Sequence, residues 1–214
     1  MRMRKISEKV PNLEDLVQKF LLVKQSQHTG ELAMHDYPNI DYELVLGHYA
    51  EIEQWVESGR VDCGFLRLPA HHDFETVSLA EDPLFAVLLE AHPLAKRGRV
   101  PLEALCEESF LLLEKKEKAE ISELFTRHKL QPHVQLRTVD DYAVMSMVES
   151  GLGLSILPGL ILRRIPYKIA ICPLGVPASR TLGLALRKDA PTPLAVRRFL
   201  DYLPYRDEKP ARLL

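Results

Sequence analysis

The residues best placed for chemistry lie in the stretch 138–158, where a polar helix start, a glycine and a short apolar run follow one another. A carboxylate at Asp140 or Asp141 can accept hydrogen bonds from the free N–H groups of a first helical turn. Gly151 stands where a helix needs a left-handed residue in order to end. Because a polar helix N-terminus at the end of a strand can hold a small anion, this stretch indicates binding of a small molecule rather than its transformation.

Motifs for catalysis or metal binding are absent from the sequence. Adjacent histidines such as His71 and His72 point to opposite sides of an extended segment, so they make a poor metal pair. The pair Gly151 and Gly153 is too short to be a phosphate-binding glycine loop. Three nearby serines stand in no Gly-x-Ser-x-Gly motif: Ser146, Ser150 and Ser155. We therefore expect no enzyme activity, no metal and no cofactor.

Composition favours an ordinary soluble protein. Of the 214 residues, 46% are hydrophobic and 27% charged, and the net charge of −2 gives no support for a nucleic-acid-binding surface. Cys63, Cys106 and Cys172 are odd in number and far apart, which is typical of reduced, buried thiols. The sequence shows no secretory signal and no apolar run long enough to span a membrane, so we expect a cytoplasmic location without membrane contact.

Helical and strand patterns alternate along most of the chain, which predicts an α/β fold. Residues 49–58 predict a helix that ends at Gly59, between strands at 41–47 and 61–66, and such units favour parallel pairing. Two short strands are expected next, at 76–79 and 84–89. Further strands are expected at 110–113, 134–139, 154–157, 168–172 and 181–187, with helices at 11–21, 101–105, 115–128, 140–150 and 194–203.

Two segments, 79–87 and 173–180, have the composition of crossings between lobes. Two crossings imply that one lobe is built from both ends of the chain and the other is inserted, with a ligand held in the cleft between them. We expect an atypical N-terminal segment at 1–37 and a tail at 208–214. The first lobe is expected to comprise 38–83 with 180–207, and the second to comprise 84–179.

Several motifs together resemble the effector-binding domain of LysR-type transcriptional regulators. They are Pro-Asn-Ile-Asp-Tyr-Glu-Leu at 38–44, Glu-Ser-Gly-Arg-Val-Asp-Cys-Gly-Phe-Leu-Arg-Leu-Pro at 57–69, His-Pro-Leu-Ala at 92–95 and Glu-Ser-Gly-Leu-Gly-Leu-Ser-Ile-Leu-Pro at 149–158. The closing strand and helix, which hold Arg180, match in order and spacing as well. The resemblance implies two Rossmann-like subdomains joined by a hinge, in a fold like that of type 2 periplasmic-binding proteins.

The same resemblance implies four effector-binding residues: Arg67, Pro69, Thr138 and Asp140. Arg67 would pair with an effector carboxylate, or would be a solvated loop arginine. Pro69 would shape that loop. Thr138 and Asp140 would bind a small polar effector, although Asp140 or Asp141 alone would equally serve as a helix cap.

A dimer interface is also implied by the resemblance, through one face of the helix at 49–58. Its residues would be Tyr49, Ile52, Trp55 and Val56, and the alternative is an ordinary core-facing helix. Family members contact DNA through an N-terminal helix-turn-helix, which we do not find in this sequence. We therefore expect the sensing domain of a regulator for a small organic acid or amino-acid-like effector, in a truncated product. The alternative is a solute-binding protein of the same fold.

Overall fold

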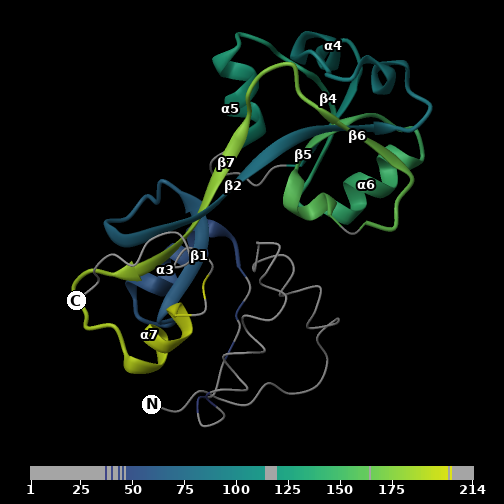
Figure 1. The fold of residues 1–214 in the computed structure, drawn as a ribbon. Helices are drawn as coiled ribbons and strands as arrows, with labels where there is room; N and C mark the ends of the chain where they lie inside the picture. Colours follow the sequence, from purple (N-terminus) through teal and green to yellow (C-terminus); the bar gives the residue numbers. More distant parts are fainter. Residues whose placement is uncertain are drawn as a thin grey trace. The chain divides into compact units, whose positions relative to one another are not determined.

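The computed structural model describes residues 47–113, 120–163 and 165–201, together with Tyr37, Ile40, Glu43, Val45 and Leu203. The helix expected at 11–21, the tail at 208–214 and most of the strand expected at 41–47 lie outside these residues. The chain divides into two compact units, and we call Met1–Glu81 with Thr181–Leu214 unit 1 and Asp82–Arg180 unit 2. Strands β2 (Phe74–Leu89) and β7 (Ser179–Arg187) connect the units (Figure 1).

In unit 1, β7 lies between β1 (Cys63–Leu68) and β2 in the strand order. Strands β1 and β7 run antiparallel, with Cys63 opposite Leu186 at one end and Leu68 opposite Thr181 at the other. The parallel partner expected for β1, at 41–47, lies mostly outside the described residues. The described edge of this sheet is therefore built from chain segments more than 110 residues apart.

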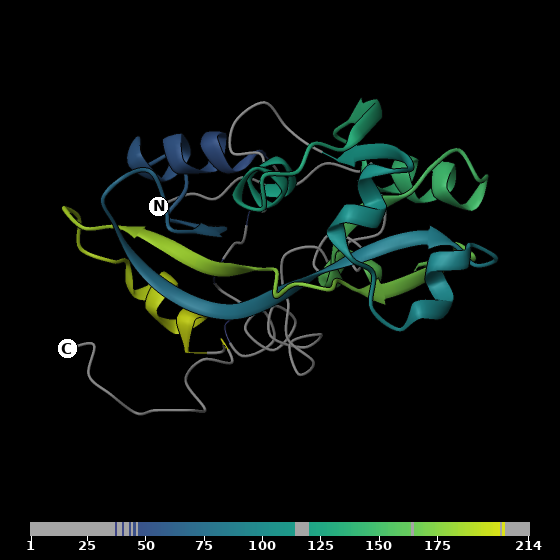
Figure 2. The same ribbon diagram turned by 90° about the horizontal axis from the view of Figure 1, so that it is seen from above.

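Two helices cover opposite faces of the unit 1 strands: α3 (Tyr49–Glu57) and α7 (Leu194–Leu200) (Figure 2). Because side chains of a strand alternate between faces, Ala185 packs with the α3 cluster, whereas Leu184 and Leu186 pack with the α7 cluster. Helix α3 begins after a capping box at His48 and ends before Gly59, whose φ is 70°. The helix predicted at 49–58 is confirmed.

Unit 2 has the C-terminal half of β2 at the centre of its strands. On one side β2 pairs antiparallel with β5 (Ser155–Pro158), and on the other with β6 (Ile169–Pro173). Strands β3 (Ser109–Leu113) and β4 (His133–Thr138) form a parallel pair. Backbone hydrogen bonds between the residues around Leu154 and β3 connect this pair to β5.

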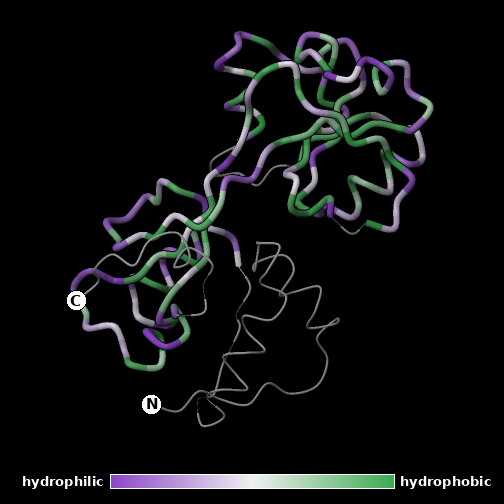
Figure 3. The backbone as a smooth tube through the Cα atoms, in the orientation of Figure 1, coloured by the Kyte–Doolittle hydropathy of each residue, from purple (hydrophilic) through white to green (hydrophobic). Residues whose placement is uncertain are grey.

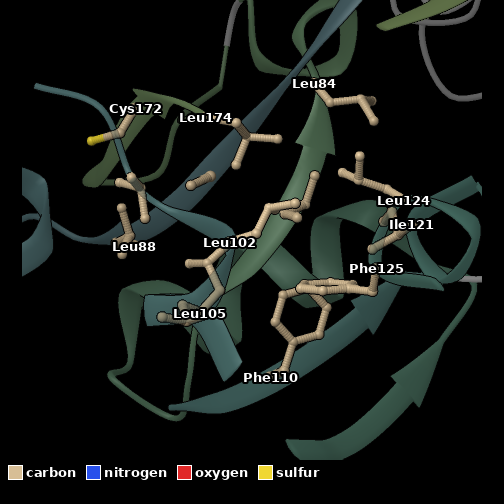
Figure 4. Packing of buried hydrophobic residues seen from close by; sticks show 14 of the residues in the cluster. Leu84, Leu88, Leu102, Leu105, Phe110, Ile121, Leu124, Phe125, Cys172 and Leu174 are labelled. Atoms are coloured by element: carbon tan, nitrogen blue, oxygen red, sulfur yellow. The ribbon is translucent and has the colours of Figure 1, made fainter. Parts of the chain in front are cut away.

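The strands of unit 2 alternate in the same way. Phe110 and Leu112 pack with α4 (Leu102–Cys106) and α5 (Glu120–Arg127). The rings of Phe110 and Phe125 pack edge-to-face, with their centroids 5.3 Å apart (Figure 4). Leu111 faces the other way, toward α6 (Asp141–Glu149). Hydrophobic residues dominate β3 and β5 (Figure 3). Helices on both faces of the strands make unit 2 a layered α/β unit of the Rossmann-like kind.

The structure corrects one expected break in the chain. Residues 74–89 form one strand of 16 residues, not two short strands at 76–79 and 84–89. Pro83 lies inside this strand with its side chain exposed, just before the run that pairs with β5 from Leu84 onward. The missing N–H of Pro83 therefore costs no hydrogen bond in the pairing of β2 with β5. The neighbouring Asp82 side chain can be buried in this strand because the guanidinium of Arg180, distant in sequence, neutralises its charge.

Candidate functional site

The residues expected to bind an effector in unit 2 lie where β4 ends and α6 begins. The Thr138 hydroxyl oxygen accepts a hydrogen bond from the Asp140 N–H at 3.2 Å. The Asp140 carboxylate in turn accepts one from the Ala143 N–H at 3.1 Å, which makes it the N-cap of α6. The prediction that Asp140 or Asp141 caps this helix is confirmed, and the cap is Asp140.

The start of α6 offers a polar surface beside exposed apolar side chains. Asp140 is exposed, and Val139 and Tyr142 are 56% and 40% exposed. The Tyr142 ring lies 6.4 Å from the ring of Tyr167. The helix dipole and the N–H groups of the first turn favour negative charge here, and the Asp140 and Asp141 carboxylates already supply it. Chemically, the site offers a hydroxyl and carboxylate oxygens beside apolar and aromatic side chains, which suits a small molecule with polar groups on an apolar body.

Arg67 and Pro69 lie in unit 1, at and just after the end of β1. Arg67 is half-buried and stands opposite Leu182 of β7. Pro69 is exposed and follows a cis peptide bond with Leu68. The structure thus places Arg67 with Pro69, and Thr138 with Asp140, in two local groups on different units.

The four residues expected at a dimer interface have different surroundings in α3. Ile52 and Val56 are buried in the core cluster of unit 1, with exposed fractions of 5% and 0%. Trp55 packs at the edge of that cluster, with the Arg60 guanidinium 4.7 Å from its ring. Tyr49 is exposed. Ile52 and Val56 therefore have a core role, while Tyr49 and Trp55 reach the surface.

Sequence reasoning missed a buried ion pair in unit 2. The Asp82 side chain is fully buried, and one of its oxygens accepts from Nε and Nη2 of Arg180 at 2.8 and 2.7 Å. The other oxygen accepts from the Leu160 N–H at 3.0 Å. Burial raises the pKa of the Asp82 carboxyl, while the Arg180 guanidinium and the Leu160 N–H act to lower it. The pair joins the middle of β2 to the start of β7, and the Leu160 N–H adds the turn after β5 to the same contact.

A second missed residue is Glu53 of α3, which is 2% exposed and accepts hydrogen bonds from the backbone of the loop after β1. The sequence held a signal for it, since Glu53 lies three residues before Val56 and therefore on the apolar face of the helix. The signal for the ion pair was an acid in one expected crossing segment and an arginine at the end of the other.

Within the described ranges, no group of three or more His, Cys, Asp or Glu side chains is arranged to hold a metal ion. The cysteines are free thiols, and burial raises the pKa of each. None of the helices in the described part of the chain has the length and apolar character needed to cross a membrane.

Comparison with known proteins gives a family match over most of the chain. Residues 32–206 match the LysR substrate binding domain. The transcriptional activator CmpR of Synechocystis is 28% identical over 178 residues, which are 80% of this chain and 59% of CmpR. The probable regulator LrrA of Synechococcus elongatus is 31% identical over 174 residues, covering 78% of this chain and 56% of LrrA. The chain thus spans somewhat more than half the length of these curated relatives.

Solved structures give the same result for the fold. HinK, a LysR family regulator from Pseudomonas aeruginosa, aligns over 90% of this chain and 67% of its own, with a TM-score of 0.74 and 26% identity. The BenM effector binding domain with its effector benzoate has a TM-score of 0.76 at 21% identity, covering 87% of this chain and 90% of that domain. The effector binding domain of QuiR in complex with shikimate has a TM-score of 0.74 at 20% identity and covers 88% of this chain and 93% of that domain. With two layered α/β units joined by two strands, and with the family match over residues 32–206, this chain belongs to the LysR substrate-binding domain family and has the type 2 periplasmic-binding-protein-like fold.

Proposed function

We propose that this chain senses a small organic acid as the effector-binding part of a LysR-type transcriptional regulator. The family match over residues 32–206 is the observation that carries the proposal. The named relatives are transcriptional regulators, which favours sensing over turnover. The start of α6, where the Thr138 hydroxyl and the Asp140 carboxylate lie beside the exposed side chains of Val139 and Tyr142, fits the ring or chain of a small acid, and Arg67 fits its carboxylate. Benzoate and shikimate, present in the BenM and QuiR domains, are compounds of this kind.

Four residues are proposed to contact the effector. Thr138 and Asp140 contribute a hydroxyl and the helix start in unit 2, and Arg67 contributes a guanidinium that can pair with a carboxylate. Pro69 sets the course of the chain after Arg67. The effector can change the arrangement of the two units only if it has a higher affinity for one arrangement than for another.

The test is calorimetric titration of the full chain with benzoate and shikimate. We expect binding of at least one acid, weakened about tenfold or more by Thr138→Ala combined with Asp140→Ala, because two lost polar contacts of about 1 kcal/mol each correspond to at least that change in affinity. Ser150→Ala is the matched control, since Ser150 hydrogen-bonds to Ser146 in the same helix at the opposite end. If wild type binds an acid and the double variant binds it with the same affinity, Thr138 and Asp140 do not belong to the effector site.

A homodimer through the surface of α3 is the second part of the proposal. Tyr49 is exposed and Trp55 reaches the surface, so these two side chains are the ones that a partner subunit can cover. Tyr49→Glu should convert a dimer into a monomer by light scattering, because a buried, unpaired charge is costly at an interface. Gln54→Glu adds the same charge at an exposed position of the same helix and should leave the mass unchanged. Equal masses for wild type and Tyr49→Glu would exclude this surface of α3 as a dimer interface.

A further inference from the structure

The loop that follows β1 is fastened to α3 by one buried carboxylate. Oε2 of Glu53 accepts a hydrogen bond from the His71 N–H at 2.9 Å and another from the His72 N–H at 3.3 Å. Glu53 is 2% exposed. Burying a carboxylate is unfavourable unless it is hydrogen-bonded, and charge-assisted bonds from N–H groups are among the stronger ones. The two bonds therefore hold the backbone of this loop at a defined place on the helix.

Further contacts tie the same loop to the same helix. Nδ1 of His72 lies 3.2 Å from the carboxylate of Glu57, one helical turn after Glu53. Beyond the loop, Phe74 is buried in the cluster that contains Ile52 of α3, and its N–H bonds to the His72 carbonyl at 3.0 Å. Leu68, just before the loop, packs against that cluster as well. Helix α3 thus contacts the loop at its start, its middle and its end.

We propose that Glu53 is a positioning residue of the effector site, because it fixes the loop that contains Pro69 and begins directly after the strand that holds Arg67. This inference depends on the proposed function, in which those two residues contact the effector. A binding group on a loop needs support from a rigid element to keep a productive geometry, and α3 with its buried carboxylate gives that support. Glu53 itself does not touch the effector.

A purely structural role and a positioning role predict different effects of substitution. Both hydrogen bonds converge on a single oxygen, so the carboxamide oxygen of Glu53→Gln can replace it. Glu53→Ala supplies no acceptor. Glu57→Ala is the matched control, since it removes an exposed carboxylate from the next turn of the helix but leaves both amide bonds in place.

The first experiment reads the loop directly, by NMR of the ¹⁵N-labelled full chain. We expect the amide proton signals of His71 and His72 to move upfield in Glu53→Ala, because each loses its hydrogen-bond acceptor. In Glu53→Gln and Glu57→Ala they should stay close to their wild-type positions. If both amides keep their wild-type signals in Glu53→Ala, the inference is overturned. If Glu53→Ala does not fold, the decision passes to Glu53→Gln, and large displacement of both signals there overturns it.

The second experiment is calorimetric titration of the same variants with benzoate and shikimate. Glu53→Ala should bind about tenfold more weakly than wild type, and Glu53→Gln should recover most of that loss. If wild type binds an acid and Glu53→Ala binds it with the same affinity, the positioning role is refuted but the proposed function is not. Absence of any wild-type binding would contradict the proposed function instead, while the amide signals would still decide whether Glu53 fixes the loop.

Discussion

Among single residues, Cys63 shows how burial controls reactivity. Burial and the neighbouring Asp62 carboxylate raise the pKa of this thiol from 9.0 to about 12. A thiol reacts through its thiolate, and a shift of 12 − 9.0 = 3 pH units lowers the thiolate fraction at pH 8 by a factor of about 1000. Because the folded state holds the proton more tightly, the stability from Cys63 is complete below pH 9 and is lost as the pH rises through about 12.

We predict that iodoacetamide alkylates Cys63 far more slowly in the native chain at pH 8 than in the chain unfolded by guanidinium. The rate should continue to rise with pH beyond 9 without a plateau, because the folded pKa lies near 12. Mass spectrometry of the digested protein gives the rate for each cysteine separately. A native rate for Cys63 that levels off near pH 9 would show that its thiol is not protected in this way.

Arg180 is a residue whose removal should be severe. Its guanidinium has two bonds to the fully buried Asp82, so Arg180→Met leaves an uncompensated buried carboxylate. We expect a loss of about 3 kcal/mol or more in the free energy of unfolding, measured by urea denaturation. Asp82→Asn combined with Arg180→Met should recover part of that loss, because the buried charge is gone and the Leu160 N–H keeps an acceptor. Equal stability of Arg180→Met and wild type would mean that the ion pair contributes nothing to the free energy of unfolding.

Helices and strands with strong local signals could be predicted from the sequence. The cap at Asp140, the glycine at 151 and the apolar run after it predicted α6 and β5, and Gly151 has the expected positive φ of 74°. Helix α3 was predicted for the same reasons. In each case the information lies within a few residues of the element, where capping, helical spacing and the need for a left-handed residue act directly.

Elements that depend on distant partners could not be predicted in the same way. The sequence around Asp82 and Pro83 reads locally as a break, yet β2 continues through it. The strand can keep Asp82 buried because Arg180, 98 positions later, neutralises it, and no local pattern contains that information. Glu53 is a similar case, since its function depends on backbone N–H groups of a loop 18 residues away.

At the scale of the whole molecule, unit 2 is a single continuous insertion, Asp82–Arg180, in a unit made from both ends of the chain. Its first and last residues are bonded to each other, so the two ends of the insertion meet. It also has two buried clusters of its own, one on each face of its strands. A group of strands and helices with its own core and with its two chain ends close together has the properties of a domain that can fold alone.

We therefore predict that a fragment comprising residues 82–180 folds by itself. Its amide NMR signals should be dispersed and its urea unfolding cooperative, because the core around Phe110 and Phe125 and the core around Val144 lie wholly within it. Arg180→Met in the fragment is the matched control and should destabilise it by an amount similar to that in the full chain, since both partners of the pair are retained. A collapsed fragment without dispersed signals would show that unit 2 needs unit 1 to fold. The two strands that join the units would then be part of one cooperative structure rather than links between two.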